Sequence, residues 1–191
     1  IIDELAHRGG HDPLEFRLQL LGDNVRARAV LKRAAKEAGW GKELDANKGM
    51  GVAFSPGFGS LNAQIAEVTV IDDQLKVDRI TCVHDCGFAI DPDAVRAQME
   101  GGIVDGLSAA LFSKITIANG AVEQSNFHDY RFMRMAEAPE ISVHLISSDG
   151  PIGGVGEAGV PAVAPAVANA IFIATGKRVR RLPLSDAGLR I

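Results

Sequence analysis

The chain has 191 residues, 47% of them hydrophobic and 23% charged, and a formal net charge of −4. This length allows one large domain or two small ones, and the negative charge argues against a nucleic-acid partner or an anionic membrane surface. Two cysteines cannot make a disulfide scaffold, and no apolar run reaches the ~18 residues of a membrane span. Because it begins at Ile1, we expect the sequence to be part of a longer polypeptide.

The first 48 residues predict a helical hairpin segment without chemistry of its own. A helix tail, 1–11, breaks at Gly9-Gly10, and the run Asp12-Pro13-Leu14-Glu15 predicts a capped helix start with a capping box. Another helix is expected from Asp23 or Asn24 to Gly39. Its basic face is expected to be solvated rather than to bind a partner, and consists of Arg26, Arg28, Lys32, Arg33 and Lys36.

Residues 49–191 predict a second unit in which strands and helices alternate. Strands are expected at 50–59, 63–71, 75–84 and 140–147, with a short terminal strand around 180–184. Asp72-Asp73-Gln74 predicts a turn, and Asn119-Gly120 predicts a tight hairpin. The fold class that follows is α+β, with a mixed β-sheet and packed helices.

A third capped helix is expected from Asp91 to about Phe112, and it contains Gln98 and three glycines, Gly101, Gly102 and Gly106. Each helical glycine costs about 1 kcal/mol relative to alanine. Close packing against another backbone or the approach of a ligand could offset that cost, and the sequence leaves both open. With a ligand, Gln98 would be the polar group aimed at it.

Cys82, His84 and Cys86 fall on one face if their segment is extended. This spacing could begin a metal site, but it lacks a fourth ligand and zinc-type spacing. A strand end with partly buried thiols is the simpler interpretation, so we assign no metal ligands.

Residues 153–175, GGVGEAGVPAVAPAVANAIFIAT, predict a glycine-rich loop that leads into a buried helix ending at Gly176. The loop carries one carboxylate, Glu157. Two roles are open for it: a ligand-facing catalytic group, or a cap of the following helix. No lysine follows the glycines as in a phosphate loop, and their spacing does not match a dinucleotide-binding turn.

At these residues the sequence resembles the large, molybdenum-binding subunit of the xanthine dehydrogenase/aldehyde oxidase family. The resemblance rests on GGVGEAGVPAVAPAVANAI, on VHDCGFAIDPDAVRAQMEGGIVDGLSAAL, on AQIAEVTV and on the opening DELAHRGGHDPLEFRLQLL. It covers nearly the whole chain. QSNFHDYRFMRM and PEISVHLI are similar to the isoquinoline 1-oxidoreductase β-subunit type, often labelled aldehyde dehydrogenase.

The resemblance implies a molybdenum–pterin cofactor, expected as molybdopterin cytosine dinucleotide, that oxidises aldehydes or N-heterocycles with water-derived oxygen. It implies that Glu157 is the general base, that Gly154, Val155 and Gly156 lie against the cofactor, and that Gln98 hydrogen-bonds near the metal's ligands. A desolvated carboxylate would have the basicity that this role needs.

The resemblance also implies partners. These are the remainder of the large subunit, a small subunit with iron–sulfur clusters, a cytochrome or another electron acceptor, and a small aldehyde or N-heterocycle. Alone, the fragment is expected to be inactive. Export signals in relatives favour the periplasm over the cytoplasm. The alternative from another class is a non-catalytic ligand-binding or assembly module in which Glu157 only caps its helix.

Overall fold

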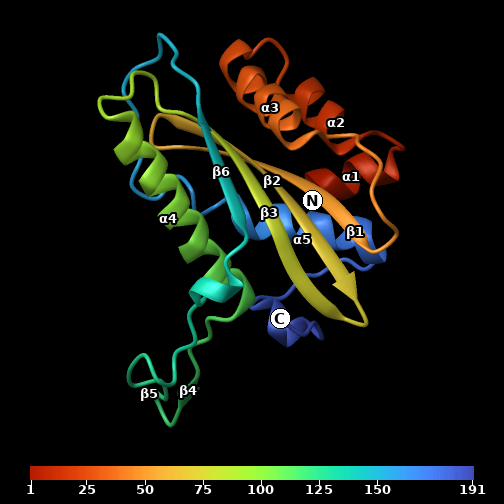
Figure 1. Cartoon of the computed structure of the whole chain (residues 1–191), viewed down its shortest axis with the longest axis vertical. Helices are drawn as coiled ribbons and strands as arrows, with labels where there is room; N and C mark the ends of the chain where they lie inside the picture. The colour runs from red at the N-terminus through yellow and green to blue at the C-terminus, as the bar shows by residue number, and fades with distance from the viewer.

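The computed structural model describes residues 1–191 and has a four-stranded sheet with helices on both faces (Figure 1). The helices are α1 (Ile2–Arg8), α2 (Pro13–Leu20), α3 (Val25–Ala38), α4 (Pro92–Leu111) and α5 (Val163–Thr175), with 3-10 turns at Met135–Glu137 and Leu184–Ala187. The strands are β1 (Lys48–Gly57), β2 (Ser60–Ile71), β3 (Gln74–Asp85), β4 (Ile117–Ala118), β5 (Ala121–Val122) and β6 (Glu140–Leu145).

The sheet has the order β1-β2-β3-β6. The first three strands are antiparallel, and β6 is parallel to β3. A parallel neighbour requires a long crossover, which here contains α4 and the β4–β5 hairpin (Figure 1). The predicted α+β class with a mixed sheet is therefore confirmed.

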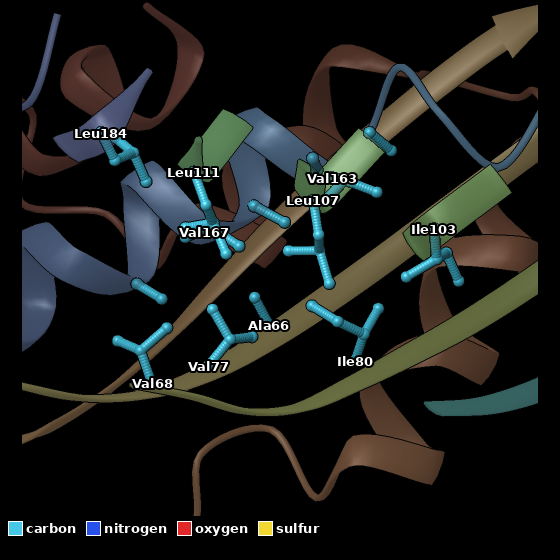
Figure 2. Close-up of a cluster of buried hydrophobic side chains, with 14 of the residues drawn as sticks. Ala66, Val68, Val77, Ile80, Ile103, Leu107, Leu111, Val163, Val167 and Leu184 are labelled. Atoms are coloured by element: carbon cyan, nitrogen blue, oxygen red, sulfur yellow. The ribbon is translucent and has the colours of Figure 1, made fainter. Parts of the chain in front are cut away.

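Two apolar cores lie on opposite faces of the sheet. The larger joins the sheet to α4 and α5, and part of it is drawn in Figure 2, where Leu107 of α4 extends towards Ala66 and Ile80 of the sheet. The smaller joins the sheet to α2 and α3 through Leu31 and Ile65. The predicted helical segment thus covers one face of the sheet. The division of the chain at residue 48 stays a prediction.

A bulge keeps β3 in contact with the larger core over its full length. Glu67 pairs with Arg79 while Val68 pairs with Val77, so Asp78 is the additional residue. Strand side chains alternate between faces, and one extra residue reverses that alternation. As a result, both Val77 and Ile80 face α4 and α5.

The predicted helix starts are present, with one correction. Asp12 accepts hydrogen bonds from the amides of Leu14 and Glu15, at 2.8 and 2.9 Å. This satisfies amide groups that have no partner within the helix. The Asp12 side chain accepts both of these bonds, and the reciprocal bond from the Asp12 amide to the Glu15 side chain is not formed. The predicted capping box is therefore half formed.

The structure corrects two further predictions, the first wholly and the second in part. The segment around Arg180–Leu184 is not a strand, since only an isolated bridge, Gln74 to Arg190, joins the C-terminal residues to the sheet. Pro183 has no amide proton to give to a ladder. The basic face of α3 is not wholly solvated either, because Arg26 makes a partly buried ion pair with Asp85.

Candidate functional site

The glycine-rich loop lies against the turn between β1 and β2 and the end of β3. The amide of Gly153 donates to the carbonyl of Cys86 at 2.9 Å, and that of Gly154 donates to Phe58 at 2.7 Å. The Ser60 hydroxyl donates to the Gly154 carbonyl at 2.7 Å. These contacts join segments far apart in the sequence, so they fix the loop's first half to the sheet.

The structure brings the predicted site residues together at the surface. The Gln98 side-chain amide on α4 donates to the Gly156 carbonyl at 3.4 Å. Glu157 follows directly, and Gln98, Gly154, Gly156 and Glu157 are all exposed, while Val155 is half-buried against the larger core. Side-chain amide, carboxylate and loop backbone therefore form one exposed polar surface.

Glu157 does not cap α5. The helix begins six residues later, at Val163, with Ala162 as the N-cap residue and no side-chain capping bond. The Glu157 carbonyl instead accepts from the Val160 amide at 3.0 Å, which closes a turn. The cap interpretation is wrong. Glu157 is also exposed, so this chain does not by itself supply the desolvation that the general-base role would need.

The glycines of α4 divide into two kinds. A Cβ on Gly102 would lie 3.3 Å from the Gly159 Cα, and one on Gly106 would lie 3.0 Å from the Val160 carbonyl oxygen. These two allow the loop to pack directly on the helix. A Cβ on exposed Gly101 would meet nothing within 4 Å, so nothing within the chain requires glycine there.

Arg26 and Asp85 form an ion pair beneath the loop, which the sequence did not predict. The Arg26 guanidinium donates to both Asp85 carboxylate oxygens, at 2.9 and 2.8 Å, and to the Gly59 carbonyl at 3.3 Å. Asp85 also accepts from the Gly87 amide and the Ser148 hydroxyl, both at 2.8 Å. Burial alone would raise the pKa of Asp85, but these hydrogen bonds hold it below its ordinary value.

A second group that the sequence analysis missed is a buried polar cluster between the sheet and α4. The Gln64 side-chain amide donates to the Gly159 carbonyl at 2.7 Å and to Asn62 at 3.1 Å. Asn62 in turn contacts Cys82 and His84. One signal was available: Asn62 and Gln64 are in phase with the apolar positions Ala66 and Val68 of the same strand.

Burial determines the protonation of Cys82 and His84. Burial raises the pKa of the Cys82 thiol to about 12, and it lowers the pKa of His84 to about 4 despite the nearby Asp85 carboxylate. Both side chains are neutral at pH 7. The simpler interpretation of Cys82 as a buried thiol therefore fits, and no group of three or more potential ligands in the chain could hold a metal ion.

An apolar pocket of about 230 Å³ adjoins the polar surface. Its lining includes Gln98, Val155 and three exposed apolar side chains, Phe88, Ile90 and Ile152. Exposed apolar groups that gather beside polar groups are typical of binding surfaces. No helix of the chain is both long and apolar enough to cross a membrane.

Residues 21–139 match a family described as the molybdopterin cofactor-binding domain. The beta subunit of isoquinoline 1-oxidoreductase from Brevundimonas diminuta is 38% identical over 98% of this chain and 25% of its own length. A nicotinate dehydrogenase subunit from Pseudomonas putida is 33% identical over 99% of the chain and 18% of its own length. The chain thus spans a quarter or less of these two relatives.

Solved structures agree in fold. The aldehyde oxidoreductase of Desulfovibrio gigas has a TM-score of 0.57 at 29% identity, over 65% of this chain and 14% of its own. Quinoline 2-oxidoreductase of Pseudomonas putida 86 has a TM-score of 0.60 at 22% identity, over 65% of this chain and 17% of its own. The chain belongs to the molybdopterin cofactor-binding domain family, as found in molybdenum-binding large subunits of the xanthine dehydrogenase and aldehyde oxidase type.

Proposed function

We propose that this chain is the part of a molybdenum hydroxylase large subunit that places a general base, Glu157, and a cofactor-facing backbone beside the molybdenum–pterin cofactor. The observation that carries the proposal is the meeting of Gln98 with Gly156, next to Glu157, on one exposed surface. These residues come from two elements that are distant in the sequence, and the same residues follow from the family resemblance.

The residues present fit such a cofactor. A Cβ on Gly101 or on Gly156 would meet nothing within 4 Å, and both glycines are exposed. Glycine at these positions is explained by the close approach of a group from outside the chain. The donors and acceptors at this surface are an amide side chain, a carboxylate and loop backbone, which suit a polar cofactor better than a bare metal ion.

When bound, the cofactor supplies the two-electron acceptor and acidifies the water that becomes the product oxygen. The chain's own contribution is narrower. The Glu157 carboxylate would take up the proton as general base, and Gln98 would hold the backbone at Gly156 so that this carboxylate is correctly placed. The apolar pocket beside Gln98 helps to exclude water once the remainder of the subunit covers it.

The substrate class that we propose is an aldehyde or an N-heterocycle. Relatives named for isoquinoline, nicotinate and aldehyde oxidation support it. Electrons would leave through iron–sulfur clusters in a small subunit and then pass to a cytochrome or another acceptor. The cytosine dinucleotide form of the cofactor and a periplasmic location remain part of this proposal.

The test is metal analysis of the complete protein together with one assay on aldehydes and N-heterocycles. We expect stoichiometric molybdenum and oxidation of at least one of the two classes. The purified 191-residue chain should hold no stoichiometric molybdenum, because it supplies only one side of the site. A complete protein that contains molybdenum but oxidises neither class would overturn the proposed substrate class. A complete protein without molybdenum would overturn the function.

A further inference from the structure

We propose that Gln64 is a positioning residue for Glu157, acting from inside the core through the backbone of Gly159. This inference rests on the proposed function of Glu157 and goes beyond it. Gln64 lies on β2 and is 0% exposed, so it reaches neither substrate nor cofactor. Any effect that it has on the reaction must therefore pass through the loop.

Two glutamine side chains hold the segment that carries Glu157, one at each end. On the outer side, Gln98 donates to the Gly156 carbonyl at 3.4 Å. On the inner side, Gln64 donates to the Gly159 carbonyl at 2.7 Å. The inner bond is shorter and fully buried, and competing water cannot reach it. We therefore assign the main restraint on this segment to Gln64.

The backbone of Gly159 is also restrained by packing against α4 and by the turn in which it lies. A Cβ on it would lie 2.8 Å from the Met99 carbonyl oxygen, so its backbone is packed against α4. The Glu157 carbonyl accepts from the Val160 amide at 3.0 Å, which closes a turn around the same point. Fixing the peptide plane at Gly159 therefore fixes the turn from which the Glu157 side chain projects.

The neighbours of Gln64 fix its own orientation. Its side-chain nitrogen has two carbonyl acceptors, on Gly159 and on Asn62, so the amide can have only one orientation. Asn62 then has its own nitrogen free to donate to Nδ1 of His84, at 3.4 Å. The donor and acceptor roles are therefore fixed from the Gly159 carbonyl through Gln64 to Asn62.

The test uses the complete, molybdenum-loaded enzyme with the variant Gln64→Met, which keeps the length of the side chain and removes its donor. Val68→Ala is the matched control, because Val68 is also fully buried on β2, four residues from Gln64, and its side chain has no hydrogen-bonding group to offer the loop. Hydrogen exchange at the Val160 amide reports the turn without reference to activity. If Gln64→Met does not fold, Gln64→Asn keeps an amide and withdraws it from Gly159.

We expect Gln64→Met to exchange the Val160 amide at least about tenfold faster and to lose about tenfold or more in kcat, with KM and molybdenum content close to wild type. Val68→Ala should lower the melting temperature without either change. A Gln64 variant that behaves as Val68→Ala does would overturn the positioning role. If Glu157→Gln keeps full turnover, the proposed function fails instead, and the exchange data still decide whether Gln64 fixes the turn.

Discussion

The Arg26 guanidinium and the Asp85 carboxylate meet in a two-point ion pair, with nitrogen–oxygen distances of 2.9 and 2.8 Å, that joins α3 to the end of β3. Arg26 also contacts Gly59 and lies against Gly150. The pair therefore connects the turn at Gly59, the turn at Gly87 and the segment at Gly150 that leads into the glycine-rich loop.

Removal of Arg26 should cost more than removal of Asp85. Arg26→Ala leaves a carboxylate that is 0% exposed without its partner, at a cost of about 3–5 kcal/mol. In Asp85→Asn the guanidinium, whose side chain is 27% exposed, regains some water, and we expect about 2–3 kcal/mol. Urea unfolding of the 191-residue chain measures both. The reverse order would contradict the assignment of Asp85 as the buried member.

Gly101→Ala should separate stability from cofactor binding. Because Gly101 is an exposed helical glycine with open space around it, alanine should raise the free energy of unfolding by ~0.5–1 kcal/mol. The same methyl group should lower the molybdenum content of the complete subunit. Gly102→Ala is the control, and should lower stability by about 1 kcal/mol because its Cβ meets the Gly159 backbone. Unchanged molybdenum content in Gly101→Ala would remove one support for the cofactor surface.

His84 should make the fold less stable as the pH falls from 6.5 towards 4. Its folded pKa is lowered from 6.5 to about 4, so in this window the unfolded chain binds a proton that the folded chain does not. Stability is fully present above pH 6.5 and decreases by about 3 kcal/mol towards pH 4. The difference in unfolding free energy between wild type and His84→Gln should therefore change across this window. A difference that does not change with pH would mean that His84 titrates normally.

The sequence predicted the elements whose causes are local. Asp12 and Asp91 cap their helices as expected, and Asn119-Gly120 turns with positive φ at both positions, since each signal lies within a few residues. Arg26 could not be assigned in this way. An amphipathic pattern shows that a face is polar, but not that a carboxylate 59 residues away lies beneath it.

The candidate site was predicted in part, for a related reason. Resemblance to a family supplied Gln98 and Glu157, and the structure places them on one surface. The buried Gln64 was missed because a polar residue within a strand is normally assigned to the solvated face. The alternation of the strand places Gln64 on the same face as the apolar residues Ala66 and Val68, and this pattern could have indicated that Gln64 is buried. Its partner, Gly159, lies 95 residues away, and only the tertiary structure shows the contact.

The most direct test of the central claim is the turnover of Glu157→Gln in the complete, molybdenum-loaded enzyme. Glutamine keeps the shape of the side chain, and Glu157 is exposed and caps no helix, so stability should remain within a few degrees of wild type and molybdenum loading should be normal. Loss of a general base typically costs 10²–10⁴-fold in rate, and we predict a fall in kcat of at least about a hundredfold. A loaded Glu157→Gln enzyme with near-normal kcat would contradict the account.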